Sequence, residues 1–531
     1  MALIVSNVHA ALTEGKDAVV ERAARKAGLK AAQIERAYIV KESVDARRKD
    51  AVRLCYTVGF DLNIDEDRAA SSRKDRDISV RRRGALSFEV GTRRLKSRPV
   101  VAGFGPAGMF AALALARNGY RPLVLERGAP VEERIQAVER FWKEGTLDEN
   151  NNVQFGEGGA GTFSDGKLTT RIHDDRCGYI LETFAQHGAP REILTRAKPH
   201  IGTDRLREVV RSIREEILSL GGEIRFHAAL RDISVRNGRL CSIELDEGKL
   251  ETEALVLAIG HSARDTFEML GNREVPMEPK AFSVGVRIEH LQREIDTALY
   301  GKFASHPALR HGEYQLSLRE GDRAVYTFCM CPGGLVVPSS SEAGGVVTNG
   351  MSEYARDREN ANAALVVSVG ASDFGSDVFA GMHFQRELEQ KAFRAGNGTY
   401  RAPAQTVGNF LAGKKGLTLG RIQPSYSLGV EACDFGAFFP PFISQMLKKG
   451  LYRFDRRIKG YACDDAVLTG VETRTSSPIR ILRGETLQSA GAEGLFPCGE
   501  GAGYAGGIVS AGVDGLRVAQ ALMRRYAPDT D

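Results

Sequence analysis

Three glycines at fixed spacing form the clearest chemical signature of the chain. Gly103, Gly105 and Gly108 follow an apolar run and precede a stretch rich in small apolar residues, in VVAGFGPAGMFAALALARNG. Between a strand and a helix, this spacing is typical of a dinucleotide-binding turn: the glycines permit the tight turn, the approach of a pyrophosphate, and close helix packing. The helix N-terminus offers free N–H groups to the phosphates. We therefore predict a dinucleotide site that includes Gly103, Gly105, Pro106, Ala107 and Gly108.

An acidic residue follows at the distance that such a site requires. Glu126 ends the apolar run RPLVLERG, which has the pattern of the next strand. An acid about 20 residues beyond the glycines binds a ribose hydroxyl and disfavours a 2′-phosphate, which argues against NADP at this site. Arg127, the next residue, is predicted to lie beside the same cofactor.

Three more distant features favour FAD over NAD, because the longer FAD contacts more of the chain. The segment NNVQFGEGGAGTFSDGKLTTR (151–171) is dense in glycine and small polar residues, which suits a backbone that wraps a flavin and its phosphates. The run ALVLAIGHS (254–262) ends in a turn at Gly260 and resembles the strand that crosses the nucleotide in many FAD enzymes. The cofactor-binding residues predicted in these two segments are Gly158, Gly159, Ala160, Gly161, Thr162, Ser164, Lys167 and Gly260.

The third feature is the late glycine cluster PCGEGAGYAGGI (497–508). It resembles a terminal motif in which an acid holds the ribitol of FAD and the next helix directs its N-terminus at the flavin ring. No strand–turn–helix with a ribose acid of its own follows, so we interpret the cluster as the far wall of the first site. The predicted contacts are Gly499, Glu500, Gly506, Gly507 and Ile508.

The chain as a whole resembles a family of bacterial FAD-dependent dehydrogenases, mostly of unassigned substrate. The resemblance rests on SVDARRK, on the two glycine-rich stretches around residues 103 and 499, on FGEGGAGTFSDGKLTTR, and on GLVVPSSSEAGGVVTNGMSEYARDRENANAA. It covers essentially the whole length. It implies noncovalently bound FAD and a small N-terminal domain before a glutathione-reductase-type FAD domain, and it implies no particular substrate.

The elements that position these motifs predict an α/β protein of several domains. A Rossmann-type, glutathione-reductase-like FAD domain is expected at 96–275 and is completed by 481–531. The region 276–480 is strand-rich and does not continue the strand–helix alternation, so it is predicted to be an inserted α+β substrate domain. Residues 1–95 are expected to form a small α/β domain that ends in a basic connector.

Composition limits the function classes. A net charge of +5 does not indicate a dedicated nucleic-acid binder, although the stretch from Arg73 to Arg98, with Arg81, Arg82 and Arg83, leaves an RNA-associated flavoprotein as an alternative. The eight cysteines are spread out without a CxxC, which fits reduced thiols and predicts no metal site. No signal peptide or membrane-spanning run is recognised, so a cytoplasmic location is expected.

The sequence does not single out one catalytic residue. The candidates for proton transfer are Asp165, Lys167, His173 and Tyr504, and Lys167 could also place a positive charge near the flavin. Cys329 and Cys331 would share one face of a strand, which more often reflects packing, or the lining of a substrate pocket, than a redox pair.

The predicted function is an FAD oxidoreductase that transfers hydride between the flavin and an organic small molecule or NAD(P)H. No second nucleotide domain is apparent, so any NAD(P)H is expected to dock transiently. A flavin-binding regulator without turnover is the remaining alternative.

Overall fold

The glycine motifs lie at one edge of a five-stranded parallel sheet. The structure is a computed structural model that describes residues 1–71, 73–82, 84 and 86–528. The sheet has the order β24-β12-β6-β7-β8, and every neighbouring pair is parallel. Its strands are β6 (Val100–Ala102), β7 (Leu123–Leu125), β8 (Glu223–Arg225), β12 (Leu255–Leu257) and β24 (Leu495–Pro497).

Both faces of this sheet are covered, as a parallel sheet of apolar strands requires. Val101, Val124 and Val256 pack on one face against the helices α3 (Pro106–Arg117), α5 (Arg176–Gln186), α6 (Thr203–Ser219) and α14 (Ile508–Arg525). The alternate residues Val100, Leu123 and Leu255 face α7 (Arg264–Asn272) and an antiparallel sheet made of β9 (Asp232–Arg236), β10 (Arg239–Leu245) and β11 (Gly248–Glu251). Helix α4 (Val131–Glu144) follows β7 and leads into the glycine-rich segment 151–171.

A seven-stranded sheet between β12 and β24 forms the second large layer, which we call the cap. Its order is β15-β16-β19-β14-β22-β20-β21, antiparallel except for the β20–β21 pair. The strands are β14 (Phe282–Leu291), β15 (Ser317–Glu320), β16 (Arg323–Cys331), β19 (Asn360–Val369), β20 (Ala402–Thr406), β21 (Val430–Ala432) and β22 (Val467–Glu472). The cap also holds the hairpin β17 (Leu335–Pro338) and β18 (Thr348–Met351). The pair β13 (Met277–Pro279) and β23 (Ile479–Ile481) connects the cap to the parallel sheet.

Helices complete the cap and enclose its core. They are α8 (Gln292–Tyr300), α9 (Ala371–Phe374), α10 (Ala380–Ala395), α11 (Val407–Ala412), α12 (Phe435–Phe438) and α13 (Pro441–Asp455). The apolar stretch 434–450 lies inside this core: Phe435, Ile443 and Leu447 are buried. Pro441 is at the first position of α13, where its missing N–H costs no hydrogen bond.

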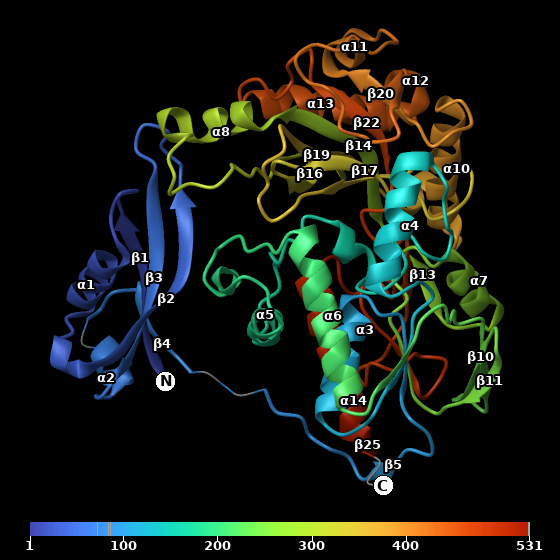
Figure 1. Cartoon of the computed structure of the whole chain (residues 1–531), viewed down its shortest axis with the longest axis horizontal. Helices are drawn as coiled ribbons and strands as arrows, with labels where there is room; N and C mark the ends of the chain where they lie inside the picture. The colour runs from blue at the N-terminus through green and yellow to red at the C-terminus, as the bar shows by residue number, and fades with distance from the viewer. Residues whose placement is uncertain (72, 83, 85, 529–531) are drawn as a thin grey trace.

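The first 81 residues form a separate antiparallel sheet of order β2-β3-β1-β4. Its strands are β1 (Ala2–Ala10), β2 (Ile34–Asp45), β3 (Arg53–Leu62) and β4 (Ile78–Arg81), with helices α1 (Lys16–Ala27) and α2 (Glu66–Ser71). Its apolar residues form a core of their own. In Figure 1 this unit stands beside the rest of the molecule, to which a long connector leads.

Two basic side chains of the connector after β4 pair with carboxylates. Arg93 lies in β5 (Arg93–Arg94), which pairs with β25 (Tyr526–Ala527), and its guanidinium is 2.7 Å from Glu253 and 3.2 Å from Glu493. Arg98 lies 3.2 Å from Glu223. Arg83, which belongs to the arginine triplet noted above, is outside the described residues. These pairs favour a connector over an RNA-binding strip.

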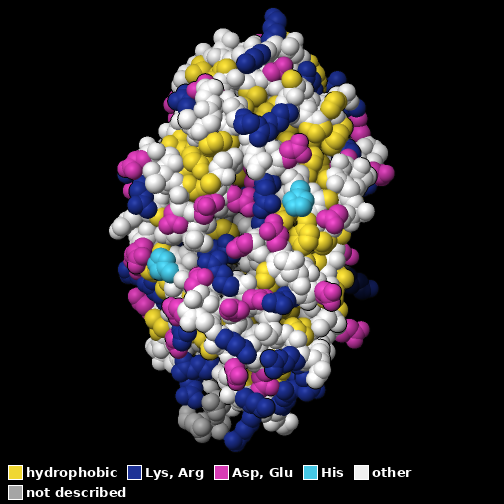
Figure 2. Space-filling model, turned by 90° about the vertical axis from the view of Figure 1, so that its right-hand side faces the viewer, with side chains coloured by type: hydrophobic (Ala, Val, Ile, Leu, Met, Phe, Trp, Pro, Cys, Tyr) yellow, Lys and Arg dark blue, Asp and Glu magenta, His cyan; other side chains and the backbone are white. Residues whose placement is uncertain are grey.

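The surface carries both signs of charge. Figure 2 shows acidic and basic side chains interspersed over most of the face that it presents, with more basic side chains toward its lower end. Within the described part of the chain, no helix is long and apolar enough to cross a membrane.

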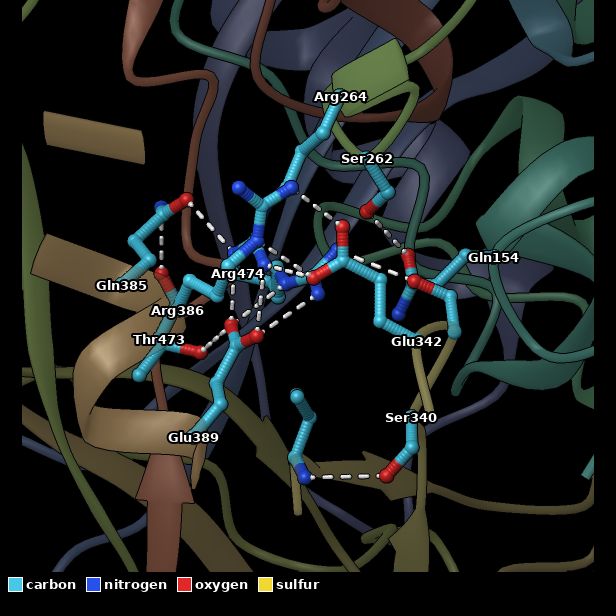
Figure 3. Close-up of polar contacts among 12 residues, drawn as sticks. Gln154, Ser262, Arg264, Ser340, Glu342, Gln385, Arg386, Glu389, Thr473 and Arg474 are labelled. Carbon is cyan, nitrogen blue, oxygen red and sulfur yellow. Dashed lines mark hydrogen bonds and ion pairs between the residues drawn. The ribbon is translucent and has the colours of Figure 1, made fainter. Parts of the chain in front are cut away.

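A buried ionic network ties the cap to the parallel-sheet layer (Figure 3). Arg264, at the start of α7, donates to both carboxylate oxygens of Glu389 in α10 at 2.9 Å. Arg474, just after β22, donates to the same carboxylate at 2.7 and 2.9 Å, and Thr473 adds a third partner at 2.7 Å. Burial alone would raise the pKa of Glu389, but the two guanidinium groups lower it to about 2. Glu389 is therefore ionised at all ordinary pH values.

Removal of the Glu389 charge should weaken the attachment of the cap to the parallel-sheet layer. We expect Glu389→Gln to lower the free energy of unfolding by roughly 3–5 kcal/mol, because two buried guanidinium groups lose their counter-charge. Thermal and urea denaturation measure the loss. The control is Glu387→Gln, on an exposed position of the same helix, which should change stability by less than about 0.5 kcal/mol. Equal stability of the two variants would contradict the role given to the network.

Candidate functional site

The order of the strands brings the predicted motifs together at the carboxyl edge of the parallel sheet. Glu126 follows β7, the Gly103–Gly108 turn follows β6, and Gly499 and Glu500 follow β24. Ligands of open parallel sheets bind at this edge, at the point where the strand order reverses. An extended FAD would therefore meet first the ribose acid, then the phosphate turn, then the ribitol acid.

The glycine turn is shaped by contacts that exclude any side chain. Gly103 has a φ of 98°, and a Cβ there would lie 2.3 Å from the Ala258 carbonyl oxygen. A Cβ on Gly108 would lie 1.9 Å from the Gly103 carbonyl oxygen. Helix α3 begins with Pro106, and no side chain caps its first turn. The free N–H groups of that turn thus remain available to phosphate oxygens.

Glu126 is buried and already bound by backbone groups. One oxygen accepts from the Phe104 N–H at 2.8 Å, and the other accepts from the N–H groups of Gly128 and Gly156, each at 2.9 Å. A carboxylate offers about four acceptor positions, so about one remains for a ribose hydroxyl. The hydrogen bonds of Glu126 thus connect the phosphate turn, the end of β7 and the glycine-rich segment.

A single buried arginine organises the glycine-rich segment. The Arg134 side chain has no exposed surface and donates to the carbonyl oxygens of Asn152, Val153, Gly156 and Glu157, at 2.6–3.2 Å. Burial lowers its pKa to about 9, so it remains charged at neutral pH. The segment then continues as a short 3-10 helix, Gly159–Phe163. A Cβ on Gly159 would lie 2.9 Å from the Gly105 Cα, which sets this helix directly against the phosphate turn.

The glycines of the late cluster fall into two groups. Gly499 and Gly501 serve protein packing: a Cβ would lie 2.5 Å from the Ala107 Cβ in the first case and 2.4 Å from the Gly260 carbonyl oxygen in the second. Gly506 and Gly507 are exposed, and an added Cβ would meet no atom closer than 4.0 Å. Only the second group faces space that a flavin could fill, next to Ile508 at the start of α14.

Glu500 is the least satisfied acid of the site. Its carboxylate has no hydrogen bond or ion pair within the described residues. Burial raises its pKa to about 7, against the charge of Lys280. A cofactor hydroxyl would give this carboxylate the donor that it lacks.

Other predicted residues lie farther from these acids or already have partners. Arg127 donates to Asp265 at 2.7 Å and to Thr266 at 3.2 Å, and its guanidinium lies over the Phe155 ring. Tyr504 is covered by Arg483, whose guanidinium lies 3.8 Å from the ring centroid. His173 is exposed in a loop. Thr162 and Ser164 donate to the carbonyl oxygens of Glu157 and Gly161 and thereby hold the turn that includes Ala160.

Lys167 belongs to a buried charge cluster between the glycine-rich segment and the cap. Its Nζ lies 2.8 Å from Asp165 and donates to the Met330 carbonyl oxygen in β16. Asp165 also accepts from Arg356, which lies 2.6 Å from Glu313. Burial alone would lower the pKa of the Lys167 ammonium group. The carboxylates of Asp165 and Glu313 have the larger, opposite effect and raise this pKa. The ammonium group is therefore charged.

A cavity of about 370 Å³ opens beside this cluster. Its walls include His200, Arg310, Tyr354 and Arg356. The ring of His200 stacks on Tyr354, and burial lowers the pKa of His200 to about 4, so this imidazole is neutral. The cavity therefore combines aromatic surface with fixed guanidinium groups, which suits a polar organic molecule.

Sequence reasoning missed Arg134 and Arg356, although both position the site. Arg134 looks like an ordinary residue of an amphipathic helix, and Arg356 lies some 190 residues from its partner Asp165. A loop whose many carbonyls lack strand or helix partners must find donors elsewhere, and this requirement was the available signal.

The residues present fit FAD. The first turn of α3 is free for the phosphates, Glu126 keeps about one acceptor position, Glu500 lacks a donor, and the chain at Gly506 and Gly507 faces open space. Within the described residues, no group of three potential metal ligands occurs.

Replacement of Arg134 tests how the loop is held. We expect Arg134→Met to lower the FAD content of the purified protein severalfold, because four buried carbonyl groups lose their donor at about 1–3 kcal/mol for each unsatisfied group. Absorbance gives the ratio of flavin to protein, and limited proteolysis within 150–171 reports the loop. Arg140→Met, on the exposed side of α4, is the matched control. Full FAD content in both variants would refute the assignment.

Comparison with known proteins gives the relationships of the chain. Residues 281–475 match the family model described as FAD-dependent protein, C-terminal domain-like, and residues 5–61 match a domain of unknown function. An uncharacterized protein of Clostridium beijerinckii is 48% identical over 533 residues, which cover 99% of each chain.

Two solved structures show weaker likeness. A geranylgeranyl bacteriochlorophyll reductase-like protein of Thermoplasma acidophilum is 13% identical over 81% of this chain and 78% of its own, with a TM-score of 0.35. Glycine oxidase from Geobacillus kaustophilus is 12% identical over 83% of this chain and 100% of its own, with a TM-score of 0.31. Scores below 0.5 do not establish a shared fold.

The family match confirms the prediction of FAD as the cofactor. The chain belongs to the same family as the Clostridium beijerinckii protein, and its cap region matches the model of the FAD-dependent protein C-terminal domain.

Proposed function

We propose that this flavoprotein is an oxidoreductase that transfers hydride between bound FAD and an organic small molecule, with NAD(P)H as a transient partner. The observation that carries the proposal is the order of ribose acid, phosphate turn and ribitol acid along one sheet edge. That order supports a glutathione-reductase-like arrangement of FAD. FAD, when bound, supplies two-electron chemistry, and the protein sets access and charge around it.

In this proposal, different residues of the chain bind the cofactor, place charge and hold the substrate. The first turn of α3 would bind the phosphates, and Glu126 and Glu500 would bind hydroxyl groups on either side of it. Lys167, held by Asp165, would keep a positive charge at the junction with the cap, where it could stabilise negative charge on a reacting ring. We assign the substrate to the cavity at His200, Arg310 and Arg356, whose inner wall is the same charge cluster.

Anaerobic mixing tests this function. FAD-loaded protein is mixed with NADH, with NADPH, and with pools of amino acids and hydroxy acids, and the visible flavin absorption is followed. We expect at least one donor to bleach the flavin. The control is complete bleaching by dithionite. A flavin that dithionite reduces but no organic donor reduces would contradict the proposal and favour a regulator without turnover.

The affinity for FAD should depend on pH through Glu500. Because burial raises the pKa of Glu500 to about 7, its carboxylate becomes protonated as the pH falls below 7 and loses the stronger, charge-assisted acceptor. We expect FAD affinity to fall over that range. Glu500→Gln should weaken binding by about 10- to 100-fold at pH 8, equivalent to about 1.5–3 kcal/mol, and should abolish this pH dependence.

Titration of the apoprotein with FAD, followed by flavin fluorescence, measures both effects. Glu485→Gln, at an exposed position nearby in sequence, is the control. Unchanged affinity and an unchanged pH profile in Glu500→Gln would show that this carboxylate does not bind the cofactor.

A further inference from the structure

Two cysteines lie at an irregular point of the cap sheet. Cys329 and Cys331 end β16, where the pairing with β19 shifts: Phe328 is opposite Ala364, but Cys331 is opposite Asn362. Three steps along β16 thus match two along β19, which defines a β-bulge. Cys329 has a φ of 43°, a left-handed conformation that a residue with a Cβ rarely adopts.

The bulge draws the two thiols together. In a regular strand, side chains at i and i+2 share a face but remain separated. Here the Cys331 thiol donates a hydrogen bond to the Cys329 carbonyl oxygen at 3.4 Å, so it lies against the backbone of the other cysteine. Both cysteines are free thiols; Cys331 is buried, whereas Cys329 is partly exposed. The pair therefore combines a partly exposed residue, Cys329, with a buried one, Cys331.

Two cations, the buried Arg287 and the partly exposed Lys167, hold the bulge in this form. Arg287, without exposed surface, donates to the Cys329 carbonyl oxygen at 2.8 Å, and Lys167 donates to the next carbonyl, that of Met330. A left-handed residue costs about 1–3 kcal/mol and persists only when its surroundings fix it, often at a functional site. Lys167 also comes from the glycine-rich segment, so the cysteine pair lies against the predicted cofactor loop.

The same groups separate the acidities of the two thiols. The hydrogen bond from Cys331 and the charges of Arg287 and Lys167 lower the pKa of Cys329, although burial opposes them. The hydrogen bond to Cys329 and burial raise the pKa of Cys331. A thiolate beside cations is the form that attacks disulfides.

We propose that Cys329 and Cys331 are a redox-active dithiol that closes reversibly to an intrachain disulfide by exchange with a small-molecule disulfide. The Cys329 thiolate attacks one sulfur of the partner, forms a mixed disulfide and releases the first thiol. The Cys331 thiol then attacks the Cys329 sulfur, and the proton that it loses is taken up by the departing thiolate, which leaves as the second thiol. Two electrons leave the protein on the two released thiols. This goes beyond the proposed function because it gives the chain a second electron-carrying couple.

The redox state of the Cys329–Cys331 pair can be measured on a single tryptic peptide. No Lys or Arg occurs between Arg323 and Arg356, so trypsin releases residues 324–356 with Cys329 and Cys331 as its only cysteines. The FAD-loaded protein is equilibrated without oxygen in reduced and oxidised glutathione, acid-quenched, alkylated with iodoacetamide and digested. We expect oxidising mixtures to yield this peptide unalkylated and lighter by two hydrogen atoms, and reducing mixtures to yield it doubly alkylated.

Single variants separate the two roles. Cys331→Ser should trap glutathione on Cys329, whereas Cys329→Ser should leave the buried Cys331 without an adduct. In the reduced wild type at pH 6.5, an ordinary thiol with a pKa of about 8.5 is about 1% thiolate, so Cys329 should be alkylated at least about 10-fold faster than Cys177. Cys177 is the internal control, because it is also partly exposed but burial raises its pKa. Lys167→Met should slow the alkylation of Cys329.

The outcomes decide between a redox pair and plain packing. Double alkylation of the peptide at every glutathione ratio, or alkylation of Cys329 no faster than that of Cys177, would overturn the proposal. Both measurements use the wild-type protein, so they hold even if a serine variant fails to fold. Neither measurement depends on whether an organic donor reduces the flavin.

Discussion

Backbone contacts that only glycine allows hold the carboxyl edge of the parallel sheet together. Gly103 touches the carbonyl after β12, Gly501 touches the Gly260 carbonyl, and Gly499 touches Ala107 in α3. These contacts bring the ends of β6, β12 and β24 into direct van der Waals contact, although the strands come from distant parts of the chain. A single Cβ at any of them would push the turn, the crossing strand and the late motif apart. The convergence of the motifs on one cofactor depends on this spacing.

Around that edge, buried charged side chains hold a segment that has little regular secondary structure. The segment 151–171 has few ladder hydrogen bonds, and Arg134 supplies donors to four of its carbonyls. Farther along, the ion pairs of Asp165 with Lys167 and Arg356 attach it to the cap. A buried charge is costly unless it is paired or fully hydrogen-bonded, so each of these groups fixes the geometry of its partners. These contacts fix the path of the irregular segment.

The cap and the cofactor edge meet at the charge cluster of Asp165, Lys167 and Arg356. The cavity lies beside Arg356, and Lys167 donates to the backbone between the two cysteines. Gly159, earlier in the same glycine-rich segment, packs against the phosphate turn. The Glu389 network sets the distance between these layers from the other end of the cap (Figure 3). A substrate, a flavin and a dithiol would in this arrangement share one group of fixed charges.

The sequence alone predicted the motifs of the site, because each of them consists of residues that lie close together in the chain. The spacing of Gly103, Gly105 and Gly108, the acid at Glu126 and the late Gly499–Glu500 pair were sufficient to predict FAD, because short-range backbone geometry limits which residues fit a phosphate turn. Only the tertiary structure decided which glycines serve packing and which face open space, since Gly499 and Gly506 are alike in sequence. It also decided the partners of Arg134, Lys167 and Arg356, and it converted Cys329 and Cys331 from strand neighbours into a hydrogen-bonded pair. These features depend on a bulge register and on buried ion pairs between segments far apart in the chain, and no local pattern of residue types encodes such contacts.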